Sequence, residues 1–197
     1  GQEIGHDTCE TLENATGGSA DDVFILNDDD NSIDAGGGND VIKSSSSFVA
    51  GEPGAEPVSD GDDTYKGGEG SDTLDYSSTS TSNLIDFVLG KATGQEIGHD
   101  TFETLENATG GSADDAFIVN TQANTVLGGA GKDTIKSSKR DDKGDKDNKG
   151  DKDKKDDGDD YFDGQDDSDT LDLSSTQAGT TVNLRTGIAT GEEIGRD

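Results

Sequence analysis

Residues 67–75 read GGEGSDTLD, and residues 128–136 read GGAGKDTIK. Both stretches begin with six residues that are rich in glycine and end in aspartate. Such a segment favours a tight turn, because glycine adopts positive φ without steric cost. The last three residues carry one apolar side chain between two polar ones, which is typical of a short strand with its middle side chain pointing inward. The pattern therefore predicts a coil of alternating turns and strands.

The nine-residue period extends well beyond these two stretches. Blocks of nine can be stacked at 17–25, 26–34, 35–43, 58–66 and 67–75, and again from residue 110 to 136 and from 155 to 172. Position 6 of the blocks holds Asp22, Asn31, Asp40, Asp63, Asp72, Asp115, Asn124, Asp133, Asp160 and Asp169. Position 8 holds Phe24, Ile33, Ile42, Tyr65, Leu74, Phe117, Val126, Ile135, Phe162 and Leu171. Position 8 is therefore the predicted core.

A longer repeat contains the short one. Residues 1–8 recur at 94–101, an offset of 93, and residues 71–75 recur at 168–172, an offset of 97. We therefore divide the chain into a first long repeat (1–93), a second (94–190) and the start of a third (191–197), which together form one continuous solenoid. Two inserts, at about 44–57 and 137–154, are expected to leave the stack as loops on one edge.

The composition restricts the possible partners. The chain has 197 residues with 15 Lys and Arg against 45 Asp and Glu, a formal net charge of −30. Nucleic acid and anionic membrane are poor partners for such a chain, and no apolar run is long enough for membrane insertion. Leu, Ile, Val and Phe make up about 17% of the residues, too few for an ordinary core. The chain is either disordered or takes up cations to fold.

The spacing favours the second possibility. Two blocks make one coil, so turns 18 residues apart lie above each other, and Asp22 is expected beside Asp40 and Asp115 beside Asp133. Two carboxylates together with several backbone carbonyls form an all-oxygen cage that suits a hard ion such as calcium. Without metal the same stack is a ladder of repelling charges. Folding should therefore be coupled to metal binding.

These blocks resemble the repeats-in-toxin (RTX, haemolysin-type) calcium-binding family, because 67–75 and 128–136 fit its G-G-x-G-x-D-x-U-x nonapeptide at every specified position. The segment from Thr101 to Gly111 is similar to the degenerate coils that join strict blocks in that family. The resemblance implies an all-β, elongated, right-handed parallel β-roll. It also implies a secreted bacterial product, usually exported by a type I system that keeps the chain unfolded until it meets calcium outside the cell.

The resemblance implies that several calcium ions are held by aspartates at position 6 and by the carbonyls of the glycine turns. The residues so implied are Asp22, Asp40, Asp63, Asp72, Asp115, Asp133, Asp160 and Asp169, with Gly18, Gly36, Gly38, Gly68, Gly70, Gly111, Gly129 and Gly131. At Asn31 and Asn124 the aspartate is replaced and the turns lack glycine, which argues against binding there. The turn at 164–167 loses two glycines while gaining acids.

Comparison of the copies discounts other candidate sites. His6 and His99 are matched by Arg196, which argues against a histidine ligand or base. Cys9 is matched by Phe102, as expected for a buried apolar position. The Gly-Lys pair in 128–134 is followed by Asp133, which would repel phosphate. Residues 145–150 resemble the start of an EF-hand loop, but Lys149 occupies a ligand position.

We therefore expect a structural role and no catalysis, because the paired carboxylates occupy repeated positions. The expected function is a calcium-dependent tandem-repeat segment that becomes a rigid rod outside the cell. Its partners would be calcium and further copies of the repeat in the parent chain. Two alternatives stay open. One is binding of a sugar or host surface through Tyr76 and the serine-rich run 77–82, and the other is self-assembly into a filament or surface layer.

Overall fold

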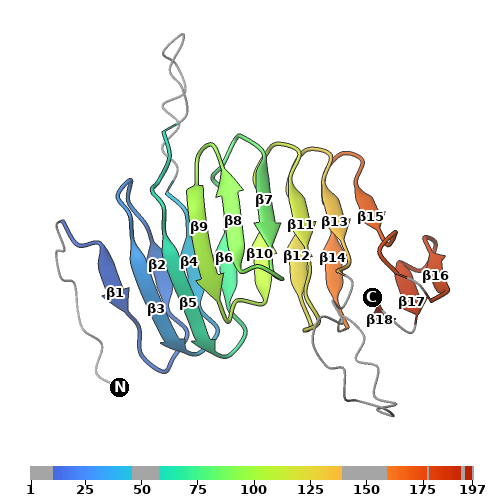
Figure 1. Cartoon of the computed structure of the whole chain (residues 1–197), viewed down its shortest axis with the longest axis horizontal. Helices are drawn as coiled ribbons and strands as arrows, with labels where there is room; N and C mark the ends of the chain where they lie inside the picture. Colours follow the sequence, from blue (N-terminus) through green and yellow to red (C-terminus); the bar gives the residue numbers. More distant parts are fainter. Residues whose placement is uncertain (1–10, 46–57, 139–158, 177, 192–193, 197) are drawn as a thin grey trace, which may run out of the picture.

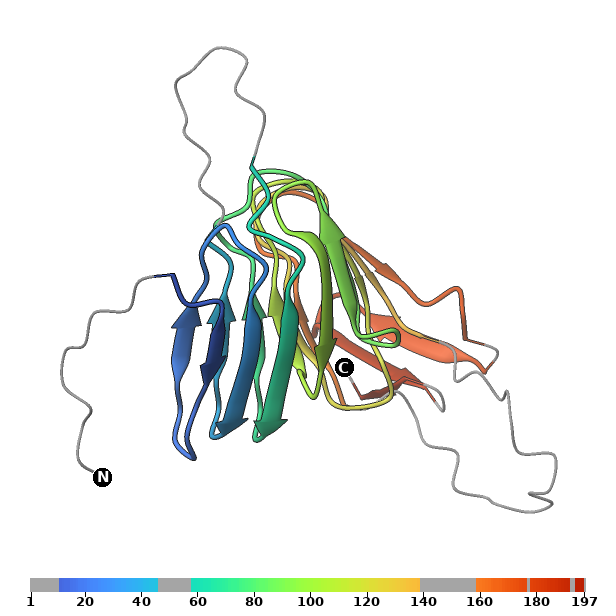
Figure 2. The ribbon, with the colours of Figure 1, turned by 60° about the vertical axis from the view of Figure 1, so that its left-hand side comes forward.

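The computed structural model describes residues 11–45, 58–138, 159–176, 178–191 and 194–196. Within these ranges the chain folds into eighteen short strands and no helix. No helix in this part of the chain is therefore long and apolar enough to cross a membrane. The strands are stacked along the longest axis of the molecule (Figure 1), and the view in Figure 2 shows two layers of strands facing each other.

The two layers are a nine-stranded and a six-stranded sheet. In spatial order the nine-stranded sheet consists of β1 (Asn14–Thr16), β3 (Ser32–Gly37), β5 (Thr64–Glu69), β9 (Gly98–Glu103), β8 (Lys91–Gly94), β7 (Asn83–Asp86), β11 (Ala116–Ile118), β13 (Thr134–Lys136) and β15 (Thr170–Asp172). The six-stranded sheet consists of β14 (Tyr161–Asp163), β12 (Thr125–Leu127), β10 (Asn107–Thr109), β6 (Thr73–Asp75), β4 (Val41–Lys43) and β2 (Val23–Ile25). Successive blocks alternate between the sheets, so the fold is an all-β parallel β-roll.

The register follows the nine-residue period. Where neither an insert nor the segment between the two long repeats intervenes, parallel neighbours lie 18 residues apart, as in Asn14↔Ser32 and Ala116↔Thr134. Across the first insert the separation is 32 residues (Ser32↔Thr64), and across the second it is 36 (Thr125↔Tyr161). These values exceed 18 by 14 and 18, the lengths of the inserts at 44–57 and 137–154. Each insert therefore leaves the stack without shifting its register.

The core combines position-8 side chains from both sheets with apolar residues from the rest of the coils and from the segment between the two long repeats. Tyr65, Phe117 and Val126 have no exposed surface, and most of the other position-8 residues are buried as well. Phe24 and Phe162, near the two ends of the stack, are only partly buried and pack against this cluster. Phe102 is also buried, as its match to Cys9 suggested, whereas Cys9 itself lies outside the described residues.

The segment between the two long repeats contains antiparallel pairing. There β7 pairs antiparallel with β8, and β8 pairs antiparallel with β9, which makes a three-strand meander inside an otherwise parallel sheet. The same meander recurs at an offset of 97 as β16 (Thr180–Asn183), β17 (Ile188–Gly191) and β18 (Gly195–Arg196). The parallel β-roll expected from the sequence is confirmed, and the meanders are local departures from its parallel pairing. A tight turn at 87–90 lets the chain reverse within one sheet instead of crossing to the other.

Close packing of the turns explains the glycines at positions 2 and 4 of the strict blocks. Gly70 has a φ of +134°, and a Cβ built on it would lie 1.8 Å from the carbonyl oxygen of Gly38 in the stacked turn. That contact is with backbone, which cannot move aside easily. The turn therefore needs glycine both for its conformation and for its contact with the next coil.

We predict that Gly70→Ala lowers the free energy of unfolding by about 1 kcal/mol or more, because the left-handed conformation alone costs an L-residue about that much. The matched control is Gly179→Ala, since a Cβ at Gly179 meets nothing within 4 Å. The control should change the stability by less than about 0.5 kcal/mol. Thermal unfolding followed by circular dichroism would measure both variants. Equal effects of the two substitutions would contradict the packing described for the turns.

Candidate metal centre in the stacked turns

The position-6 carboxylates form a ladder along the stack. The backbone N–H of Asp22 donates to Oδ1 of Asp40 (2.8 Å), and that of Asp40 donates to Oδ1 of Asp72 (2.8 Å). In the second repeat the N–H of Asp115 donates to Oδ1 of Asp133 (2.8 Å), which repeats the arrangement. Asp22 thus lies beside Asp40, and Asp115 beside Asp133, as the 18-residue spacing predicts. The ladder continues from Asp133 to Asp169 at 3.0 Å.

These aspartates fall into two groups, according to whether their second carboxylate oxygen, Oδ2, accepts a hydrogen bond. In Asp22 and Asp115, Oδ2 accepts the N–H of the glycine four residues earlier, Gly18 at 2.9 Å and Gly111 at 2.7 Å. In Asp40, Asp72 and Asp133, Oδ2 is buried and accepts no hydrogen bond. The latter group belongs to the three blocks that have glycine at positions 2 and 4. In these three blocks the strict glycine pattern accompanies a buried carboxylate oxygen that accepts no hydrogen bond from the protein.

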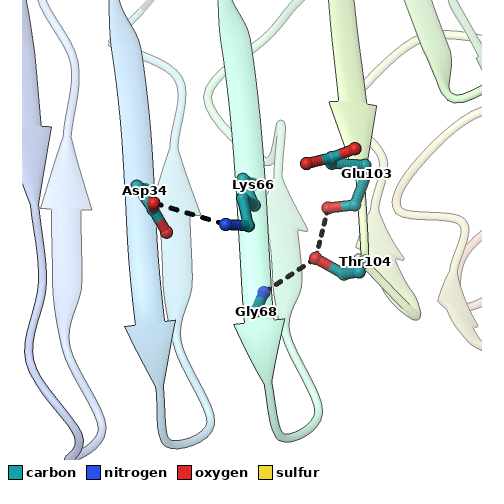
Figure 3. A network of polar contacts seen from close by, with 5 residues as sticks. All are labelled: Asp34, Lys66, Gly68, Glu103 and Thr104. Atoms are coloured by element: carbon teal, nitrogen blue, oxygen red, sulfur yellow. Dashed lines mark hydrogen bonds and ion pairs between the residues drawn. The ribbon is translucent and has the colours of Figure 1, made fainter.

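The backbone of the turns accounts for this difference. Position 2 has positive φ in the strict blocks, at Gly36, Gly68 and Gly129, but not at Gly18 or Gly111. In the turn at 67–72 the N–H of Gly68 donates to the hydroxyl of Thr104 on the next coil (2.8 Å), as Figure 3 shows, and not to Asp72. A left-handed residue at position 2 thus directs its N–H away from the aspartate. The freed oxygen is then available to a ligand.

These buried oxygens fit a hard cation. Burying a carboxylate oxygen without a partner is costly, and burial raises the pKa of Asp72 and Asp133 above the ordinary aspartate value. Among the described residues, no three His, Cys, Asp or Glu side chains converge to hold a metal ion. A cation here would have to take most of its ligands from the carbonyls of the turns, and calcium accepts such oxygen-rich shells.

The remaining position-6 residues are placed differently. Asp63 uses both oxygens within the protein, since Oδ1 accepts the N–H of Asn31 (2.6 Å) and Oδ2 accepts the hydroxyl of Tyr65 (2.6 Å). Oδ1 of Asp160 accepts the N–H of Asn124 (2.8 Å). Asp169 is exposed on the last turn of the ladder. That turn keeps positive φ at Gln165 (68°) and Asp167 (75°) although glycine is absent at both positions.

The two asparagines at position 6 satisfy their turns with their own amides. Asn31 donates through Nδ2 to Oδ1 of Asn27 (2.8 Å) and accepts the N–H of Asn27 (3.3 Å). Asn124 accepts the N–H of Asn120 (3.1 Å) and donates to the carbonyl of Glu106 (3.0 Å). An amide supplies both a hydrogen-bond donor and an acceptor, so each asparagine satisfies backbone and side-chain groups of its own or the neighbouring turn. Because an amide is neutral, these turns also carry less negative charge. That they are poor metal sites stays a prediction.

The ladder includes residues that the sequence did not single out. Glu106 accepts the N–H of Asp72 (3.0 Å), and Asp100 accepts the N–H of Asp63 (2.9 Å). Burial raises the pKa of Asp100 to about 8, and the hydroxyl of Tyr76 donates to its Oδ2 (2.5 Å). The sequence did carry a signal for Asp100, because residues 100–103, DTFE, match positions 6 to 9 of the nine-residue block.

Tyr76 was the aromatic residue proposed for an exposed binding surface. It is fully buried, so the hypothesis that it lies on the surface was wrong. His99 is exposed.

The glycine-rich turns of the two long repeats lie on opposite edges of the roll. Those at 17–22, 35–40 and 67–72 lead into the six-stranded sheet, whereas those at 110–115, 128–133 and 164–169 lead into the nine-stranded sheet. In Figure 1 these are the lower and the upper edges of the stack. The switch arises because the meander keeps three strands in one sheet, so β1 and its counterpart β10 fall in different sheets.

Comparison with family models agrees with this geometry. The model of the RTX calcium-binding nonapeptide repeat matches in four copies, over residues 13–45, 58–75 and 109–138. These stacked segments are RTX calcium-binding nonapeptide repeats. RTX repeats bind calcium, and the matches include the turns of Asp40, Asp72 and Asp133. No curated protein matches the chain. The EF-hand-like residues 145–150 lie outside the described part of the chain.

We predict that Asp72→Asn weakens calcium binding by roughly tenfold or more and lowers the number of ions bound, because it removes a charge facing the turn. The amide oxygen can still accept the N–H of Asp40, so the ladder is retained. Asp34→Asn is the matched control, because it makes the same change in net charge at a residue on the outer face. There Oδ2 of Asp34 lies 3.4 Å from Nζ of Lys66 (Figure 3). Isothermal titration calorimetry would measure both, and equal effects would contradict a specific site at Asp72.

Proposed function

We propose that this chain is a calcium-dependent structural segment of a large secreted or cell-surface bacterial protein. The observation that carries the proposal is the set of buried, unpartnered oxygens of Asp40, Asp72 and Asp133 in stacked RTX turns. Calcium supplies positive charge at these oxygens and coordinates the carbonyls beside them. The position-6 aspartates and the glycine turns of the strict blocks are the proposed ligands.

The charge of the chain explains why folding would wait for calcium. The formal net charge is −30, and the carboxylates of successive turns are brought together along each edge of the stack. Repulsion among them opposes the compact state until a cation neutralises it. Most strands bury only one apolar side chain, so the burial of apolar surface contributes little to offset that repulsion. Metal binding and folding are then one coupled process.

This coupling suits a protein that must leave the cell unfolded. A chain that stays extended where calcium is scarce can pass through a one-step (type I) secretion system, and calcium outside the cell then converts it into a rod. The stacked register, which runs through both long repeats without a shift, supports a rigid rod over a flexible chain of separate domains. The segment acts as a stalk, spacer or folding module in this proposal.

Of the two alternative roles, a specific observation weakens one. Binding of a sugar or host surface loses its aromatic candidate, because Tyr76 is buried. Self-assembly into a filament or surface layer does not depend on Tyr76 and is therefore the second candidate function.

We predict that calcium converts the chain from an extended coil to a compact rod. Far-ultraviolet circular dichroism should show little strand signal in chelator and a cooperative rise on addition of calcium. Small-angle X-ray scattering should show the radius of gyration falling in the same range of calcium concentration. Magnesium at equal concentration is the control, since it demands octahedral geometry and keeps its waters. Strand signal of full size in chelator would contradict the proposal.

A further inference from the structure

A three-residue turn follows β9 at a place where other coils have six residues. Residues 104–106 connect β9 to β10, whereas six residues separate β11 from β12 and β12 from β13. Glu106 comes directly before β10, as Asp72 comes directly before β6, and its Oε2 accepts the N–H of Asp72 (3.0 Å). The family matches end at residue 75 and resume at 109, so this turn lies outside them. It occupies the place of a glycine turn in the stack but contains no glycine.

Thr104, the first residue of this turn, has a strained backbone. Its φ is 52°, in the left-handed region that a β-branched residue rarely adopts. Thr11, at the same place in the copy of this turn at 11–13, has a φ of 57°. Strain of this kind persists only where the surrounding contacts hold it, and it is frequent at ligand sites. Its presence in both copies indicates that the turn depends on this conformation.

Two oxygens of Thr104 face the glycine turn of the previous coil. The hydroxyl accepts the N–H of Gly68 (2.8 Å), as Figure 3 shows. In addition, a Cβ built on Gly67 would lie 2.0 Å from the carbonyl oxygen of Thr104 and 2.5 Å from Oδ2 of Asp72. The carbonyl oxygen and Oδ2 are therefore close enough to share one calcium ion, whose bonds to oxygen are about 2.3–2.6 Å long.

The same pair of oxygens is found where two repeat blocks stack. A Cβ built on Gly128 would lie 2.3 Å from Oδ2 of Asp133 and 2.8 Å from the carbonyl oxygen of Gly164, the first residue of the next block. Thr104 thus takes the place that the first glycine of a block has elsewhere. Asp72, like Asp133, buries its Oδ2 without a hydrogen bond. The short turn therefore offers its neighbour the same carbonyl that a glycine turn offers.

We propose that the carbonyl oxygen of Thr104 and Oδ2 of Asp72 bind one calcium ion at the joint between the two long repeats. The hydroxyl of Thr104 is the positioning group, because it holds the N–H of Gly68 away from Asp72 and leaves the carboxylate oxygen to the ion. Calcium takes about six to eight oxygens, and carbonyls of the turn at 67–72 supply further ligands.

This site rests on the proposed function and adds a role for calcium within it. Asp72 belongs to the first long repeat, and Thr104 belongs to the second. An ion held by both residues joins the two repeats across a turn that has no glycine. Calcium then stabilises the joint as well as the stacked blocks on either side of it.

The first test counts the calcium ions bound to the whole chain by native mass spectrometry, with circular dichroism of each sample in calcium. Gly67→Ala places a methyl group between the two oxygens, so this variant should bind one ion fewer than the natural chain. Gly37→Ala is the matched control, because neither glycine has positive φ and a Cβ at Gly37 meets no atom closer than 3.7 Å. The control should bind the full number of ions.

The second test separates positioning by the hydroxyl from packing of the side chain. Thr104→Val keeps the branched shape but loses the hydroxyl, so one ion should bind at least about tenfold more weakly in isothermal titration calorimetry. Thr104→Ser keeps the hydroxyl and should bind calcium as the natural chain does. These two variants decide the question if Gly67→Ala gains no strand signal in calcium.

Other outcomes would overturn the joint site. If Thr104→Val unfolds at a lower temperature but binds the same number of ions with the same affinity, the role of Thr104 is structural only. Loss of an ion from Gly37→Ala as well would show that the effect of Gly67→Ala is not specific. Either result leaves the proposed function intact, whereas a natural chain that binds no calcium would contradict the proposed function and, with it, this site.

Discussion

The hydrogen bond from the backbone N–H of one turn to the carboxylate of the turn stacked on it is the constraint on which this roll depends. It fixes the coil register, as between Asp22 and Asp40, and it places one carboxylate above another along each edge. Where the turn has glycine at positions 2 and 4, the second carboxylate oxygen is left buried and unpartnered. A stack held together in this way accumulates negative charge, and a cation is the group that relieves it.

Much of the fold could be predicted from the sequence because the nine-residue period is a local signal. Each block specifies its own turn and its own inward side chain, so Tyr65, Leu74 and Phe117 were identified as core residues from spacing alone. The positions of the two inserts also follow from the period, because each one separates two blocks that keep the register. The neighbours of each position-6 aspartate were predictable for the same reason.

The remaining features depend on contacts that no local pattern encodes. The antiparallel meander at 83–103 depends on a tight turn that reverses the chain. The meander also decides which edge of the roll carries the glycine turns, and this becomes clear only when each strand is assigned to a sheet. The sequence pattern treats Asp115 and Asp133 as equivalent. They differ because the N–H of Gly111 occupies one oxygen of Asp115, whereas the left-handed Gly129 leaves that of Asp133 free.

Hydrogen–deuterium exchange of the turns and strands, with and without calcium, tests the central claim most directly. If the carboxylate ladder needs calcium, the amides of Asp40, Asp115 and their flanking strands will exchange slowly in calcium and at the rate of an unfolded chain in chelator. The two long repeats should gain protection together, since one register runs through both. Equal protection of these amides in calcium and in chelator would show that the ladder is stable by itself and would contradict the account.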